Sequence, residues 1–122
     1  TTHTLPEHLK IYGDLITPED FKYCIECKKG YNKENLYSIY NNRSEFWGFL
    51  NQCEKDSEKC CRIPMVIFKQ DRHPILAIIP RYCTPLQEIK YIEIAKPPEN
   101  LAQYRIYLLD ELLTCDNSLW FN

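Results

Sequence analysis

Two pairs of residues in the segment CIECKKGYNK, residues 24–33, could do chemistry, and they predict different proteins. Cys24 and Cys27 have the C-x-x-C spacing that many zinc sites use. Glu26 and Lys28 place a carboxylate and an ammonium two residues apart in an otherwise apolar run. The local structure of the segment decides between these interpretations, because it sets which side chains share a face.

A β-strand over residues 21–29 favours the second pair. The run FKYCIECKK is aromatic and apolar at most positions before its lysines, which is typical of a strand. Because side chains alternate along a strand, Cys24, Glu26 and Lys28 share one face, and Cys27 points to the other. Two thiols on opposite faces do not converge on one zinc ion. We therefore expect Cys27 to pack in the core rather than to bind zinc or act as a nucleophile.

The remaining cysteines also argue against a zinc site or a disulfide framework. The chain has seven cysteines, an odd number, and Cys60 and Cys61 are adjacent, without the spacing of a second ligand pair. Cys24, Cys53 and Cys115 lie inside apolar patterns, as buried free thiols do. The sequence therefore predicts reduced thiols that are mostly buried.

Glu26 and Lys28 suit a metal-dependent reaction at a phosphodiester. Burying both charges is costly unless they are paired or bound to metal. Asp14 lies in a preceding strand candidate, residues 8–16, and a hairpin could bring it opposite Glu26. Two carboxylates can hold Mg²⁺ through oxygen ligands, and the metal lowers the pKa of a bound water. A lysine beside them can stabilise the developing charge. The alternative is a structural ion pair at a strand edge.

The elements that must position these residues form an alternating α/β pattern. A polar turn at residues 17–20 would join the first two strands. The apolar positions Phe46, Phe49, Leu50 and Cys53 recur at helical spacing and should face the core. Residues 102–109 are ambiguous between helix and strand, but their Tyr-x-Ile-Tyr content favours a strand. We expect a mixed sheet covered on both faces, with strands at 8–16, 21–29, 63–69, 75–80, 89–95 and 102–109, helices at 33–40 and 45–59 (the latter capped by Ser44), and a helical turn at 110–113.

Composition limits the function classes. Apolar residues make up 44% and charged residues 26% of the 122 residues, which is ordinary for one globular domain. The sequence has neither a membrane-spanning apolar run nor a signal peptide, so we expect a cytoplasmic protein without membrane contact. The net charge is −2, but residues 22–43 hold five basic side chains against two acidic ones. This local basic face could meet phosphates, or it could be an ordinary solvated surface.

The ordered set of motifs resembles the PD-(D/E)XK nuclease superfamily, and within it the phage-type Holliday-junction-resolvase-like proteins. These proteins place a Gly-Asp before a first core strand, an Ile/Val-Glu-x-Lys strand next, a Trp-containing helix with a glutamine, and then an apolar strand that ends in Phe-Lys. The matching stretches are GDL (13–15), IECKK (25–29), FWGFLNQCEKDSEK (46–59) and IPMVIFKQDRHPILAIIP (63–80). The resemblance implies a restriction-endonuclease-like core in a single domain, residues 1–122, that lacks the N-terminal helix of many members.

The resemblance also implies a role for individual residues. Asp14 and Glu26 would be metal ligands, with the backbone carbonyl of Cys27 as a further ligand. Lys28 would be the catalytic lysine, and Gln52 would face the site and orient water or phosphate. The residues expected to contact DNA are Lys29, Lys33, Arg43 and Lys69.

The implied activity is that of a Mg²⁺- or Mn²⁺-dependent DNA endonuclease. Its substrate would be branched, Holliday-junction DNA, in a bacterial or phage-infected host cell. Symmetric junction cleavage needs two active sites, so the resemblance implies a homodimer. One alternative is a catalytically silent nucleic-acid-binding or protein-interaction module on the same fold. Another is a nuclease of a different substrate class, such as a nicking or repair enzyme.

Overall fold

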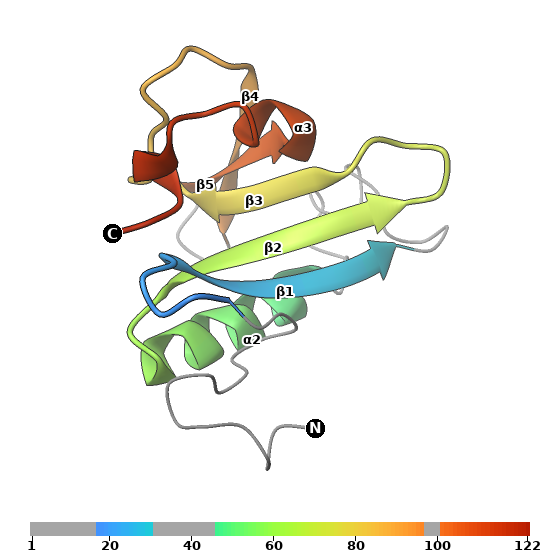
Figure 1. The fold of residues 1–122 in the computed structure, drawn as a ribbon. Coiled ribbons are helices and arrows are strands. Elements are labelled where there is room, and N and C mark those ends of the chain that lie inside the picture. The colour runs from blue at the N-terminus through green and yellow to red at the C-terminus, as the bar shows by residue number, and fades with distance from the viewer. Residues whose placement is uncertain (1–16, 31–45, 97–100) are drawn as a thin grey trace.

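A five-stranded mixed sheet forms the centre of the molecule in a computed structural model, which describes residues 17–30, 46–96 and 101–122. The strand order is β1-β2-β3-β5-β4. Figure 1 shows one long helix, α2, along one face of the sheet and the C-terminal segment on the other. The elements are β1 (Tyr23–Gly30), α2 (Phe46–Lys59), β2 (Ile63–Gln70), β3 (Leu76–Pro80), β4 (Tyr91–Lys96), β5 (Leu101–Leu108), α3 (Leu109–Leu112) and the 3-10 turn η3 (Asn117–Leu119).

The unit β1-α2-β2 supplies the parallel part of the sheet. β1 and β2 pair in parallel, from Tyr23 opposite Ile63 to Gly30 opposite Gln70. Parallel neighbours need a crossover, and α2 lies within it. Because of this register, the C-terminal ends of both strands lie side by side. The charged side chains of β1 are in its second half, close to this end of the sheet.

The remaining strands pair antiparallel. β2 and β3 form a hairpin, and β5 inserts between β3 and β4. The strand predicted over residues 102–109 is thus confirmed against the helical alternative. Its alternation explains this outcome, because Tyr104 and Ile106 pack under α2 while Tyr107 packs on the opposite side of the sheet. A strand can serve two cores in this way, since successive side chains point to opposite faces.

Two hydrophobic layers hold the sheet. Beneath α2, Leu50 and Cys53 pack on Val66, and each of the three is fully buried. On the other face, the C-terminal segment packs on β1, where the Tyr23 hydroxyl donates to the Leu119 carbonyl at 2.8 Å. The expected coverage of both faces is therefore confirmed for the described residues.

The end of α2 has an identifiable local cause. Cys61 has a φ of 57°, in the left-handed region that favours glycine. The Arg62 amide donates to the Ser57 carbonyl at 2.9 Å, and the Cys61 amide donates to the Glu58 carbonyl at 3.3 Å. These two bonds are those of a Schellman motif, which satisfies the last carbonyls of a helix and reverses the chain into β2.

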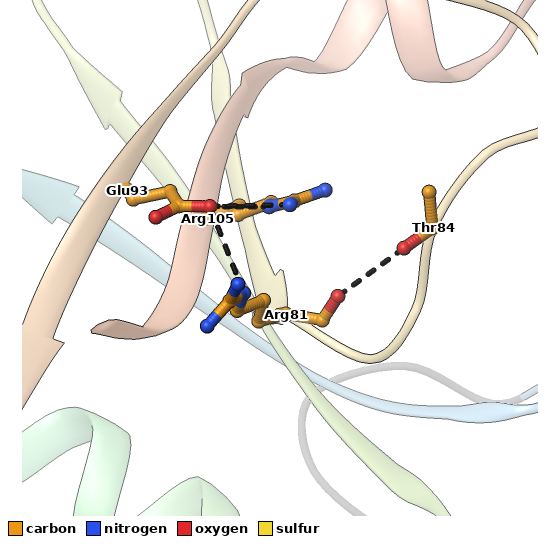
Figure 2. A network of polar contacts seen from close by, with 4 residues as sticks. All are labelled: Arg81, Thr84, Glu93 and Arg105. Atoms are coloured by element: carbon orange, nitrogen blue, oxygen red, sulfur yellow. Dashed lines mark hydrogen bonds and ion pairs between the residues drawn. The ribbon is translucent and has the colours of Figure 1, made fainter. Parts of the chain in front are cut away.

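A small ionic network links the segment that follows β3 to the neighbouring strands β4 and β5. Figure 2 shows the Glu93 carboxylate facing two guanidinium groups. Arg105, its partner across the β4–β5 pair, lies 3.1 Å away, and Arg81 lies 3.7 Å away. The Thr84 hydroxyl donates to the Arg81 carbonyl at 3.3 Å. These contacts position residues 81–84 at the end of the sheet opposite the β2–β3 turn.

The strand predicted at residues 8–16, the helix at 33–40 and the cap at Ser44 lie outside the described residues. The other predicted elements are confirmed, with boundaries within two residues. No helix among the described residues is long and apolar enough to cross a membrane.

Candidate active site

β1 holds Glu26 and Lys28 on the face that α2 covers. Their partners in the parallel register are Val66 and Phe68, and both of these belong to the core beneath α2. The backbone of β1 meets α2 two residues earlier, where the Cys53 thiol lies 3.5 Å from the Cys24 carbonyl. The alternation predicted for β1 is therefore confirmed.

The Glu26 carboxylate is almost fully withdrawn from solvent. Glu26 is 8% exposed, and it is one of two buried polar residues among those described. A carboxylate in such a position is costly unless other groups stabilise its charge. A hydrogen-bond donor, a cation or a metal can supply that stabilisation. A buried carboxylate on a mostly apolar strand thus needs such a stabilising group beside it.

Lys28 lies two residues after Glu26, nearer to the C-terminal end of β1, and is only half-buried. Its ammonium lies 4.6 Å from the centroid of the Phe49 ring, on the first half of α2. A cation over an aromatic face is held by the electrostatic field of the ring, and the ring also excludes water from one side of the ammonium. Phe49 was expected only as a core residue. Its spacing on the helix showed that it faces the sheet but not that its neighbour is Lys28.

The two thiols next to Glu26, those of Cys24 and Cys53, are uncharged. Burial raises the pKa of the Cys24 thiol, and it raises the pKa of Cys53 to about 12. Neither thiol therefore carries charge near neutral pH. Glu26 thus lies beside uncharged sulfur atoms, not beside a thiolate nucleophile.

The prediction that Cys27 packs in the core is wrong, because Cys27 is exposed. Its side chain points away from α2, as alternation requires, but the C-terminal segment covers only the first part of β1 on that face. Cys27 instead lies at an apolar groove of about 500 Å³, together with Ile25, Met65 and Ile67. Its backbone carbonyl as a metal ligand stays a prediction.

The zinc alternative finds no support in the geometry. Cys24 is fully buried on the α2 side, whereas Cys27 is exposed on the other. All seven cysteines lie in the described part of the chain, and none forms a disulfide. Within that part, no group of three or more His, Cys, Asp or Glu side chains could hold a metal ion. A metal at Glu26 therefore needs a donor from elsewhere, and Asp14, predicted as that donor, lies outside the described residues.

Gln52 lies on α2, as predicted, but its side chain is exposed. Its amide nitrogen donates to the Asp56 carboxylate at 3.1 Å, one turn further along the helix. Gln52 is one turn after Phe49, so it flanks the contact that α2 makes with Lys28. Its role towards water or phosphate stays a prediction.

The predicted DNA contacts are described only in part. Lys29 and Lys69 are direct partners in the β1–β2 register, so they extend the charged end of β1 across two strands. Lys29 makes an exposed ion pair with Asp71 at 3.7 Å, and the Lys69 ammonium donates to the His73 carbonyl. Lys33 and Arg43 lie outside the described residues.

A separate cleft of about 820 Å³ lies at the other end of the sheet. Glu54, Tyr104 and Arg81 are among the residues that line it, and neither Glu26 nor Lys28 does. The Tyr104 hydroxyl donates to the Glu54 carboxylate at 2.5 Å, and burial, followed by this bond, raises the pKa of the phenol. The carboxylate–lysine pair is thus distinct from this cleft.

Comparison with known proteins adds a family to this geometry. A family model described as "Phage putative PDDEXK endonuclease" matches residues 3–119. A search of curated proteins found no match, and neither did a search of solved structures. The matched range includes every described strand and helix as well as Asp14, Glu26 and Lys28.

Proposed function

The chain belongs to the phage PDDEXK endonuclease family, and from that premise we propose that it hydrolyses DNA phosphodiester bonds at Glu26 and Lys28 with Mg²⁺ or Mn²⁺. The observation that carries the proposal is the presence of a buried carboxylate and a half-buried ammonium on the same face of β1. Structural ion pairs also join such groups, so the family match is what favours catalysis.

The donor chemistry of Glu26 fits a hard divalent cation, which prefers carboxylate and carbonyl oxygens. In this proposal Glu26, Asp14 and the Cys27 carbonyl hold the metal. The metal, when bound, supplies a polarised water and neutralises phosphate charge. Glu26 contributes its charge from a site that water barely reaches, where electrostatic interactions are strongest.

Lys28 acts on the reacting phosphate. Its ammonium is held against Phe49 but remains half-exposed, so it can reach a substrate at the sheet edge. A fixed positive charge at this position stabilises the extra negative charge that develops as water attacks. Gln52 lies within the helix turn next to this contact and would orient water or phosphate.

The substrate we propose is branched DNA of the Holliday-junction type, cut by a homodimer during recombination. Its support is the sequence resemblance, and two-fold symmetric junctions call for two equivalent active sites. A linear duplex substrate would need neither the branch nor the dimer. The two substrates are therefore compared directly.

The test is cleavage of a four-way junction and of a linear duplex of the same sequence, with Mn²⁺, Mg²⁺ or EDTA. We expect junction cleavage with either metal, none in EDTA, and a loss of about 10²–10³-fold or more in rate for Lys28→Ala. Lys59→Ala, which removes one positive charge from the exposed C-terminal end of α2, is the matched control and should cleave like wild type.

The outcomes separate the alternatives. If wild type binds DNA but cuts nothing with Mn²⁺, the protein is a silent binding module. If it cuts linear and branched DNA equally well, the junction preference is wrong but the nuclease activity stands. A Lys28→Ala variant that cleaves at the wild-type rate would defeat the proposed site.

A further inference from the structure

We propose that the β2–β3 turn, residues 70–74, is a DNA-backbone contact that presents Arg72 to a phosphate near the scissile bond. This inference rests on the proposed function, since it names a further substrate contact of the same site. It concerns a residue that the motifs did not single out.

The turn lies beside the charged end of β1. Gly30 and Gln70 are partners in the β1–β2 register, and Lys28 lies two residues before Gly30. At about 3.3 Å of rise per residue and roughly 4.8 Å between strands, the start of the turn is on the order of 10 Å from Lys28 along the backbone. Figure 1 shows the turn at the edge of the sheet where β1 also ends. In this proposal a duplex bound at Lys28 runs past the turn, and since the phosphates of each strand recur about every 3.4 Å along the helix axis, one of them lies close to the turn.

Arg72 occupies a backbone position that favours glycine or asparagine. The His73 amide donates to the Gln70 carbonyl at 3.0 Å, which closes a four-residue turn with Arg72 as its third residue. The φ of Arg72 is 65°. A positive φ at this third position is typical of a type II turn, where the Cβ of any residue other than glycine adds strain. The turn thus carries an arginine at a cost to the backbone, and recognition of a ligand would offset that cost.

The surroundings fix the backbone of the turn and leave the guanidinium exposed. The Lys69 ammonium donates to the His73 carbonyl, and a ring nitrogen of His73 lies 2.8 Å from the Asp71 carbonyl. Arg72 is exposed and makes no ion pair or side-chain hydrogen bond with any residue that the structure describes. An arginine on a fixed turn loses little further backbone freedom when it binds a phosphate.

The charge around the turn suits a phosphate backbone. Lys29, Lys69 and Arg72 contribute three positive charges against the one carboxylate of Asp71. The Lys29–Asp71 pair is 3.7 Å long between side chains that are 61% and 81% exposed, so it is weak and gives way easily to a phosphate. Contacts of this kind position DNA without reading its sequence.

The test compares two substitutions at left-handed backbone positions, of which only the one at Arg72 also removes a positive charge. Arg72→Asn and Cys61→Gly each place a residue that tolerates positive φ at a left-handed position. We expect both to raise the melting temperature slightly. Only Arg72→Asn should weaken the binding of a linear duplex, by roughly eightfold at 0.1 M salt, because the slope of log K against log salt falls by about 0.9 for each lost phosphate contact.

Binding is measured by fluorescence anisotropy in EDTA, over a range of salt concentrations. Arg72→Lys keeps the charge and should retain most of the affinity, while Lys59→Ala controls for the loss of one positive charge elsewhere. Equal binding by Arg72→Asn and wild type would overturn the inference and leave the proposed function intact. Equal weakening by Arg72→Asn and Lys59→Ala would also overturn it, since the effect would then be one of net charge. Wild type that binds neither the linear duplex nor a four-way junction would also overturn the inference, whereas the proposed function is decided by the cleavage assay.

Discussion

At the scale of the residue, β1 shows how one strand separates reactive from inert groups. Glu26 and Cys24 face α2 and are buried, whereas Cys27 faces the opposite side and is exposed. The pKa of the Cys24 thiol is raised because burial disfavours the thiolate, and the same holds for Cys53. Since the thiolate is the reactive form, the cysteines of this chain should differ greatly in reactivity although none is in a disulfide.

We therefore expect iodoacetamide at pH 8 to modify Cys27 and Cys61 first in the folded protein. Cys53, with a pKa of about 12, and Cys24 are buried and remain neutral at this pH, so they should resist modification. Mass spectrometry of peptides from timed reactions gives the order. In 6 M guanidinium chloride all the cysteines should react alike. Early labelling of Cys24 or Cys53 in the folded protein would contradict the packing of β1 against α2.

At the scale of the element, α2 joins the sheet to the candidate site. Its inner face places Leu50 and Cys53 in the core, and Phe49, beside them, meets Lys28. Its outer face carries Gln52, which is exposed. The helix therefore stabilises the molecule through one stripe of residues and faces solvent with another, as its amphipathic sequence indicates.

Two substitutions two residues apart on α2 separate these roles. Leu50→Ala should lower the free energy of unfolding by about 2–5 kcal/mol, because it leaves a cavity where a side chain is fully buried. Gln52→Ala should change it by no more than about 0.5 kcal/mol, as is usual for an exposed position. Urea denaturation followed by circular dichroism measures both. A large loss for Gln52→Ala would mean that this side chain has a structural function.

At the scale of the whole molecule, the parallel β1-α2-β2 unit carries the described residues of the candidate site, and the antiparallel strands pack beside it. β1 and β2 end together, with Lys28 on the face that α2 covers and Lys29 and Lys69 on the opposite face, and the β2–β3 turn follows at this end of the sheet. β3 lies next to β2 and β5 lies next to β3, and side chains of both strands enter the two core layers. A ligand held at this end should stabilise the entire fold, since binding only to the native state shifts the unfolding equilibrium.

Mn²⁺ should accordingly raise the melting temperature of the wild-type protein, and EDTA should remove the effect. At a metal concentration of 100 times Kd the stabilisation is about 2.7 kcal/mol. Glu26→Gln should lose most of the shift, because a neutral amide is a poorer ligand for a hard cation. Lys28→Ala should keep it.

A structural ion pair predicts a different set of melting curves. Loss of Lys28 would then leave the buried Glu26 without its counter-charge and cost roughly 3–5 kcal/mol. A strong destabilisation of Lys28→Ala, with no effect of Mn²⁺ on wild type, would favour that alternative over a metal site.

The sequence by itself determined the local features of this protein. A period of two along residues 21–29 placed Glu26 and Lys28 on one face, and helical spacing after residue 45 predicted α2. These patterns are readable because side-chain direction follows from the backbone of one short segment. The roles of Asp14 and the other predicted site residues remain predictions.

Only the tertiary structure decided which segments meet. The insertion of β5 between β3 and β4, the contact of Phe49 with Lys28 and the place of Arg72 beside the end of β1 all join residues far apart in the sequence. The exposure of Cys27 has the same origin, since an apolar strand pattern does not show how far another segment covers it. Periodicity shows which way a side chain points, but its partner is set by the packing of the whole chain.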